Sequence, residues 1–240
     1  MNERRDSRLA LFDLDNTLLT GDSDTLWCDF LVAQGRLDAS TFAAANADME
    51  QRYRAGRASA EEFCHFYVSL LRGISRVEGE VLRQQFFVDW IRPRIPDDAR
   101  ALVEKHRSLG DELILTTATN RFITELTARE FGIDNLIAIE TECIDGIFTG
   151  EPLGVLNMRD GKVVRLKLWL EERRWPLELL NEATFYSDSI NDLPLLLSVG
   201  NPIAVDPDAK LAREVAARGW PTILLSRVPN FGEKHVPRSD

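Results

Sequence analysis

The pattern of apolar and polar residues begins with one short apolar segment, and the residues after it repeat with a helical period. Leu9–Leu14 is a largely apolar run between a polar head and Asn16-Thr17, which predicts a short buried strand. Four stretches with helical spacing follow, and glycine or proline lies near most of their ends. They cover about residues 23–34, 40–54, 59–73 and 77–90, and Ser59 with Glu62 forms a capping-box pattern at the start of the third.

After Pro93 and Pro96, strands and helices alternate along the chain. We expect helices at 98–108, 121–131, 162–173, 193–198 and 211–218, and strands at 112–116, 136–139, 183–186, 203–205 and 222–225. Such alternation predicts an α/β fold with a parallel sheet covered by helices on both faces. The helical segment of about 70 residues after the first strand is longer than an ordinary crossover. We interpret it as an inserted helical cap.

These boundaries predict the domain organisation. The α/β core comprises residues 1–20 and 93–228, and the all-helical cap comprises residues 21–92. Residues 229–240 are polar and proline-containing, so we expect a flexible tail. Ligands of such sheets bind at the carboxyl ends of the strands. Candidate functional residues should therefore follow the predicted strands.

Composition narrows the function classes. The 240 residues include 44% hydrophobic and 28% charged residues, ordinary values for a globular protein, and the net charge of -10 disfavours a nucleic-acid partner. No apolar run reaches the roughly 18 residues of a membrane span, and the polar start has no signal-peptide pattern. Cys28, Cys64 and Cys143 are too widely spaced to suggest a disulfide framework or a zinc site. We expect a cytoplasmic protein without a membrane partner, and the sequence carries no signal for an oligomeric state.

The end of the first predicted strand carries two acids, Asp13 and Asp15, followed by Thr17. Carboxylates that leave a buried strand are costly unless a cation compensates them, and Mg²⁺ prefers oxygen ligands. A turn with two exposed acids is the alternative. The next strand ends in Thr116-Thr117-Ala118-Thr119, whose hydroxyls and free N–H groups suit phosphoryl oxygens or simply cap a helix.

Two later segments complete the candidate site. Lys162 opens a helix after Asp160-Gly161 and can neutralise a phosphoryl group, although it can equally be a solvated surface lysine. Asp188, Asn191 and Asp192 follow the strand at 183–186. There, the first acid is placed to bind a metal, and Asn191 with Asp192 is placed to support it. A plain loop is the alternative interpretation.

The order Asp-x-Asp-x-Thr, Thr, Lys, Asp-x-x-x-Asp resembles the haloacid dehalogenase superfamily, in particular its phosphoserine-phosphatase-like branch (subfamily IB) with a helical cap. The resemblance covers about residues 8–225. It implies a Rossmann-like parallel sheet core and a phosphoric monoester hydrolase that forms an aspartyl-phosphate. The segment 201–208, near Arg218-Gly219-Trp220-Pro221, also looks like this branch.

The resemblance implies a role for each matching residue. Asp13 is the nucleophile, and Asp15 is the general acid and base. Asp13 and Asp188 hold Mg²⁺ through their side chains, and Asp15 holds it through its carbonyl. Thr117 with its neighbour Ala118, and Lys162, bind the phosphoryl oxygens. Asn191 contacts phosphate or substrate, and Asp192 steadies Lys162 or a metal-bound water.

Departures from the branch bear on the substrate. Ser187 and Ser189 stand where the family usually has glycines, and Asp22 occupies the place of an acid on the cap hinge. His65 or Tyr67 stands where the branch has an arginine that binds the substrate carboxylate. A carboxylate-binding site needs a fixed cationic fork. We therefore expect a small phosphorylated metabolite, preferably an amino-alcohol phosphate such as histidinol phosphate. Phosphoserine phosphatase, a phosphotransferase and a non-catalytic binding module remain the alternatives.

Overall fold

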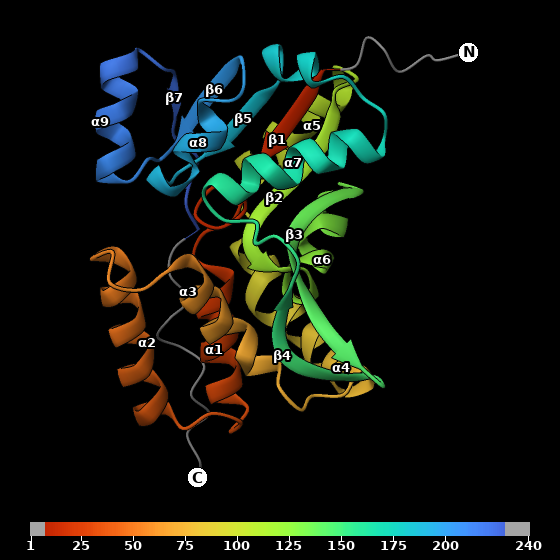
Figure 1. Ribbon diagram of the computed structural model, residues 1–240, viewed down its shortest axis with the longest axis vertical. Coiled ribbons are helices and arrows are strands. Elements are labelled where there is room, and N and C mark those ends of the chain that lie inside the picture. Colours follow the sequence, from red (N-terminus) through yellow and green to blue (C-terminus); the bar gives the residue numbers. More distant parts are fainter. Residues whose placement is uncertain (1–7, 229–240) are drawn as a thin grey trace.

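A seven-stranded sheet in the order β4-β3-β2-β1-β5-β6-β7 forms the core of the protein in Figure 1, a computed structural model that describes residues 8–228, and β3 and β4 extend into the lower half of the view. Its strands are β1 (Leu9–Phe12), β2 (Glu112–Asn120), β3 (Asn135–Ile144), β4 (Ile147–Leu153), β5 (Thr184–Ser187), β6 (Asn201–Val205) and β7 (Thr222–Ile223). Neighbouring strands are parallel except that β4 runs antiparallel to β3. The predicted α/β fold is confirmed, and the sheet, predicted to be parallel, is parallel except for β4.

Helices cover both faces of the sheet, and α1–α4 lie in the lower half of Figure 1 beside strands β3 and β4. They are α1 (Ser23–Ala33), α2 (Ala39–Arg54), α3 (Ala60–Val68), α4 (Arg76–Phe86), α5 (Asp97–Ser108), α6 (Arg121–Glu130), α7 (Asp160–Glu172), α8 (Leu193–Leu196) and α9 (Ala209–Arg218). Short 3₁₀ turns are η1 (Ser69–Leu71), η3 (Arg92–Arg94), η4 (Leu177–Asn181) and η5 (Ile190–Asp192), and α4 continues into a π-helical turn, η2 (Phe87–Ile91).

The central strand β1 explains why the sheet has two covered faces. Leu9 and Leu11 contribute to an apolar cluster with residues of α7, α8 and α9, such as Leu166. Ala10 and Phe12 point to the other face and join the cluster that contains residues of α5 and α6. All four residues of β1 are buried because side chains alternate between two packed faces. This packing fixes the carboxyl end of β1, from which Asp13 leaves.

The helices between β1 and α5, which the sequence predicts to form a cap, attach to the sheet in two ways. Trp27 and Phe30 of α1 pack against Phe86 of α4, and Trp27 also packs against Phe122 of α6. These rings belong to the same apolar cluster as one face of the sheet. Helices α2 and α3 instead join a smaller cluster around Tyr53, Cys64, Val68, Ile139 and Met158. The predicted capping box at Ser59 and Glu62 starts α3.

The β3–β4 hairpin corrects the sequence prediction, which ended the strand at Ile139 and contained no β4. Asp145 and Gly146 have positive φ values of 50° and 78° and form the two-residue turn of this hairpin. Asp-Gly is a strong hairpin signal that our interpretation overlooked. The hairpin reaches the cap: the Gly73 N–H donates to Phe148 O at 2.9 Å, and the Arg76 N–H donates to Gly146 O at 2.7 Å. Consequently the sheet is not wholly parallel, and the segment before α4 is hydrogen-bonded to its antiparallel edge.

Other predicted elements differ from the observed ones mainly at their ends. The helix expected at 77–90 comprises α4 and the π-helical turn η2, and the predicted breaks at Pro93 and Pro96 precede α5. The predicted tail, residues 229–240, lies outside the described residues. No helix in the described part of the chain is long and apolar enough to cross a membrane.

Candidate active site

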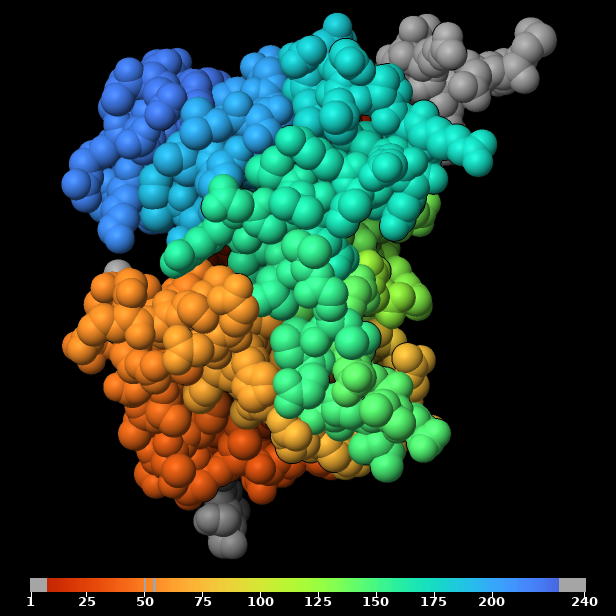
Figure 2. Space-filling model, viewed as in Figure 1, coloured from red at the N-terminus to blue at the C-terminus, as the bar shows by residue number. Residues whose placement is uncertain are grey.

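A cavity of about 180 Å³ lies between the carboxyl ends of the strands and helices α2 and α3. Figure 2 shows the hollow between α2–α3 (orange) and the core above them. Its described lining comprises Asp13, Asp15, Asn16, Asp22, Asp24, Tyr53, Phe63, Cys64, Tyr67, Val68, Ala118, Thr119, Asn120, Ile139, Met158, Arg159, Lys162, Asp188, Ser189, Asn191 and Asp192. The ends of the strands and the helices α1–α3 both contribute side chains, and the size suits a small molecule.

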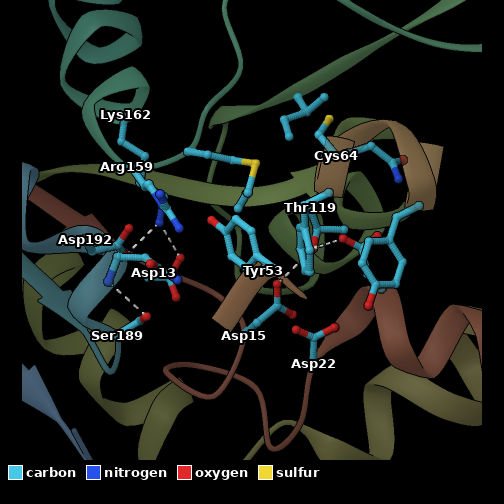
Figure 3. A pocket seen from close by; sticks show the side chains of 18 of the residues that line it. Asp13, Asp15, Asp22, Tyr53, Cys64, Thr119, Arg159, Lys162, Ser189 and Asp192 are labelled. Carbon is cyan, nitrogen blue, oxygen red and sulfur yellow. Dashed lines mark hydrogen bonds and ion pairs between the residues drawn. The ribbon is translucent and has the colours of Figure 1, made fainter. Parts of the chain in front are cut away.

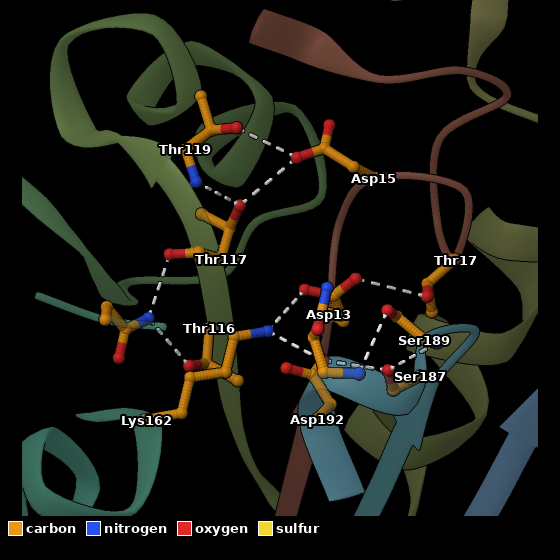
Figure 4. A network of polar contacts seen from close by, with 12 residues as sticks. Asp13, Asp15, Thr17, Thr116, Thr117, Thr119, Lys162, Ser187, Ser189 and Asp192 are labelled. Atoms are coloured by element: carbon orange, nitrogen blue, oxygen red, sulfur yellow. Dashed lines mark hydrogen bonds and ion pairs between the residues drawn. The ribbon is translucent and has the colours of Figure 1, made fainter. Parts of the chain in front are cut away.

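Asp13 and Lys162 form the floor of this cavity. The Lys162 Nζ atom donates to Asp13 Oδ1 and to Asp192 Oδ2, each at 2.7 Å (Figure 4). Residue exposures of 6%, 2% and 3% for Asp13, Lys162 and Asp192 show that all three groups are withdrawn from solvent. The structure thus brings together an acid from the end of β1, a lysine from α7 and an acid from the loop after β5, as the sequence predicts.

Asp188 lies close to Asp13 through a shared hydroxyl. Thr17 Oγ1 is 3.3 Å from Asp13 Oδ2 and 3.1 Å from Asp188 Oδ1, and it accepts the Asp188 N–H. In residues 8–228, no three His, Cys, Asp or Glu side chains form a metal cage by themselves. The predicted Mg²⁺ set needs two carboxylates and the Asp15 carbonyl. Oxygen donors and crowded acids fit a hard cation.

Asp15 is held on the side of the cavity that faces the cap. Its carboxylate accepts the Ser23 N–H at 2.7 Å and the Thr119 hydroxyl at 2.9 Å. Thr117 is fully buried, and its hydroxyl lies 3.4 Å from Asp15 Oδ2. Ala118 lines the cavity, whereas Thr117 does not. The Thr117 hydroxyl therefore contacts the acid in this structure.

Burial of several acids in one cavity raises their pKa values. Burial raises the pKa of Asp13 to about 6, where Lys162 opposes the shift and Asp192 adds to it. Burial, then the charges of Asp22 and Asp13, raises the pKa of Asp15 to about 7. The pKa of Asp188 is also raised, mainly by burial. Burial opposes the charge on Lys162, but Asp13 and Asp192 outweigh it and raise the pKa of the lysine.

The serines that replace family glycines make specific contacts in the loop after β5. Ser187 Oγ donates to Asp192 Oδ2 at 2.8 Å and accepts the Ser189 N–H. Ser189 Oγ accepts the Asn191 N–H at 3.2 Å. Asn191 is exposed and lines the cavity. These hydroxyls order the loop that carries Asp188 and Asp192.

The cap residues predicted to contact substrate have different positions. Asp22 and Tyr67 line the cavity; Asp22 also caps α1 through the Thr25 N–H, and the Tyr67 hydroxyl donates to Asn46 at 2.8 Å. His65 does not line it. Its ring is half-exposed, with Nε2 3.0 Å from Glu151 Oε2 of β4. The predicted substrate contact of His65 is therefore corrected: α3 turns residues 63, 64, 67 and 68 toward the cavity, and a side chain two positions from Tyr67 points elsewhere.

The prediction missed several lining residues, and Figure 3 labels Tyr53 and Arg159 among them. Asp24 comes two residues after Asp22 but belongs to no recognised motif, and its Oδ1 atom is buried without a hydrogen-bond partner among the described residues. Tyr53 and Arg159 meet across the cavity, with the guanidinium carbon 4.6 Å from the ring centroid. No spacing rule marks either residue, because one comes from the end of a long helix and the other from a tight turn.

Comparisons with known proteins agree with this geometry. The model of the haloacid dehalogenase-like hydrolases matches residues 10–197. The histidinol-phosphatase of Neisseria meningitidis serogroup C is 39% identical over 216 residues, which cover 90% of this chain and 97% of that protein. The phosphoserine phosphatase SerB1 of Mycobacterium tuberculosis is 32% identical over 222 residues, 88% of this chain and 68% of that protein.

A solved structure has the same fold. It is a protein with unknown function from Bordetella pertussis Tohama I, 44% identical, with a TM-score of 0.86 over 90% of this chain and 98% of that one. The family match spans most of the chain and includes all four motif segments. The chain therefore belongs to the haloacid dehalogenase-like hydrolase family.

Proposed function

We propose that the protein is a Mg²⁺-dependent phosphomonoesterase that acts on a small metabolite through a phosphorylated Asp13. The observation that carries this proposal is the buried floor of the cavity. There, the Asp13 carboxylate lies 2.7 Å from Lys162 Nζ, beside Asp188 and Asp192. A carboxylate nucleophile divides one difficult displacement into two easier steps, and the lysine offsets charge on the phosphoryl oxygens.

The side chains divide the work as follows. Asp13 Oδ2, which faces Thr17 rather than Lys162, is the oxygen available to attack phosphorus. Asp15 gives a proton to the leaving oxygen and later takes one from water, and its contacts to Ser23 and Thr119 hold it in place for both transfers. Asp13, Asp188 and the Asp15 carbonyl would hold Mg²⁺. When bound, the metal neutralises charge on the phosphoryl group.

The cavity wall supports a cationic substrate. Asp22 and Asp24 line the side nearest α1, and the cap contributes no arginine to the described lining. Arg52, one possible substitute, pairs with Asp48 and Glu62 instead. An ammonium group would be favoured beside these acids. Together with a relative named histidinol-phosphatase, this wall favours an amino-alcohol phosphate such as histidinol phosphate.

Two alternatives have specific support. Phosphoserine is the substrate in the name of SerB1, and Arg159 places one cation in the cavity that a carboxylate could use. Phosphotransfer to an alcohol needs the same base, so Asp15 suits it as well as hydrolysis. We also infer that residues 21–92 act as the cap, that the protein is cytoplasmic and that no nucleic acid is a partner.

A panel of phosphate esters tests the proposal. Histidinol phosphate, phosphoethanolamine and phosphoserine are compared by kcat/KM with Mg²⁺ present, and Asp13→Asn serves as the inactive control. We expect histidinol phosphate to exceed phosphoserine by about 30-fold or more, because phosphoserine adds a carboxylate to an acidic wall. Phosphoserine as the best substrate would contradict the substrate class. Phosphoryl transfer to an added alcohol in preference to water would identify a phosphotransferase.

A further inference from the structure

Arg159 has a backbone conformation that usually requires glycine. Its φ and ψ are 49° and -124°, and the Gly161 N–H donates to Met158 O at 2.8 Å, which closes a tight turn. This is the first central position of a type II′ turn, where a side chain is unfavourable. Strained residues persist where the surroundings determine them, and they concentrate at functional sites. The strained backbone therefore indicates that the Arg159 side chain has a function.

The turn that carries Arg159 is fixed to the core. Asn157 is fully buried, and its Nδ2 donates to Thr116 Oγ1, Thr117 O and Ile137 O at 2.9–3.0 Å. Gly161 lies so close to the chain that an added Cβ would come within 2.0 Å of Leu156 O. The direction in which Arg159 leaves the turn is consequently set before any ligand binds.

The side chain of Arg159 packs on the cap. Its guanidinium carbon lies 4.6 Å from the Tyr53 ring centroid, and the Phe63 ring stacks on Tyr53 at 4.2 Å. The Arg159 guanidinium and the Phe63 ring cannot both occupy one face of the Tyr53 ring at these distances, so the Tyr53 ring lies between them. Stacking of this kind restrains a guanidinium while leaving its N–H groups available. Core and cap thus meet at this contact on the cavity wall (Figure 3).

Both partners retain unused hydrogen-bonding capacity. Arg159 forms no ion pair with the described side chains, although six aspartates line the same cavity. Tyr53 is 8% exposed, and its buried hydroxyl forms no hydrogen bond of good geometry in the described part of the chain; burial raises the pKa of this phenol, and the nearby Arg159 guanidinium opposes the shift. Lys162, three residues after Arg159, already donates to Asp13 and Asp192. A phosphate ester brings three terminal oxygens that need donors beyond the lysine.

We propose that Arg159 and the Tyr53 hydroxyl bind the terminal oxygens of the substrate phosphoryl group from the side opposite Asp13. The inference rests on the proposed function and adds two binding residues to that site. Arginine suits two oxygens at once, and the phenol adds a third donor. Because Arg159 belongs to the core and Tyr53 to α2, this contact is complete only when the cap lies against the core.

Arg159→Gly tests the proposal because glycine suits the positive φ. We expect a melting temperature equal to or above that of the wild type. We also expect KM for histidinol phosphate and phosphoethanolamine, and the Ki of inorganic phosphate, to rise by the same factor of about 10–100. Tyr53→Phe keeps the ring and should raise the same constants by a smaller factor. The matched control is Arg173→Ala, which removes a guanidinium 3.9 Å from the Trp169 ring, outside the cavity, and should change none of them.

Calorimetric titration of inorganic phosphate into the wild type and Arg159→Gly, with Mg²⁺, separates this proposal from the proposed function. Weaker phosphate binding by the variant supports the phosphoryl contact even if histidinol phosphate is not the substrate. Unchanged phosphate affinity and unchanged KM overturn it. A loss confined to phosphoserine also overturns it, because Arg159 would then bind a carboxylate.

Discussion

Lys162→Met removes the cation from the floor of the cavity while keeping a side chain of similar length. The ammonium group lies 2.7 Å from both Asp13 and Asp192, and all three residues are buried. Methionine leaves two carboxylates without their counter-ion. We expect a large loss of stability together with the loss of turnover.

The size of this loss follows from the burial. Removing one partner of a buried ion pair costs about 3–5 kcal/mol. A protein of this length loses about 2–4 °C in melting temperature per kcal/mol, so we expect a decrease of about 6–20 °C. The loss of stability should depend on pH, since the remaining carboxylates lose their buried negative charge when they bind a proton.

The direction of the pH dependence comes from Asp13. Burial already raises its pKa to about 6 while Lys162 lowers it, so the variant should raise this pKa further. Unfolded aspartate ionises near pH 4, and stability is therefore lost as pH rises from about 4 through the folded pKa. The variant should be more strongly destabilised at pH 8 than at pH 5.

Thermal unfolding of metal-free protein at pH 5 and pH 8 measures the effect. Lys167→Met, on an exposed position of the same helix, is the matched control and should unfold like the wild type. Adding Asp192→Asn to Lys162→Met should recover part of the stability without recovering turnover. A Lys162→Met variant as stable as the wild type at pH 8 would refute the assigned ion pairs.

Three further predictions concern the same cavity. Asp13→Asn should lower kcat by several orders of magnitude and leave the fold intact, whereas turnover within about tenfold of the wild type would exclude a covalent role. A chelator should abolish activity and Mg²⁺ should restore it, with Ca²⁺ binding but failing to support turnover; full activity of metal-stripped protein would contradict the assignment of Asp13 and Asp188. Burial, then the charges of Asp22 and Asp15, raises the pKa of Asp24, so ionisation of Asp24 destabilises the fold as pH rises above about 4. Asp24→Asn should therefore raise the melting temperature at pH 7.5 and not at pH 4, and equal shifts at both pH values would count against this origin.

The sequence could predict the floor of the cavity because it depends on topology. Asp13, Lys162 and Asp188 lie at strand ends or helix starts, and parallel strands bring these ends to one edge of the sheet. A hydrophobic pattern that alternates between helix and strand is enough to place them there. The sequence pattern is enough to predict that these residues meet. The distances among them depend on side-chain packing, which the pattern does not describe.

The residues of the cavity wall could not be predicted from the hydrophobic pattern. His65 and Tyr67 are two residues apart on α3, so only one can face the substrate, and the choice is made by packing against the hairpin that ends in β4. Arg159 is a single residue in a turn, where no period identifies its direction. Tyr53 reaches the cavity because α2 folds back onto residues far away in sequence, such as Met158.

The two ways in which the cap attaches suggest how such a protein could be re-engineered. Helices α1 and α4 share their apolar cluster with the sheet, so exchanging them would replace core residues such as Trp27 and Phe86 and disturb the packing of the sheet. Helices α2 and α3 pack through a separate small cluster and contribute the described cap residues Tyr53, Phe63 and Tyr67 to the cavity. Residues 39–68 therefore form the natural unit for a graft. Transplanting this unit between related chains would exchange Tyr53, Phe63 and Tyr67 on the cavity wall and leave Asp22, Asp24 and the catalytic floor in place.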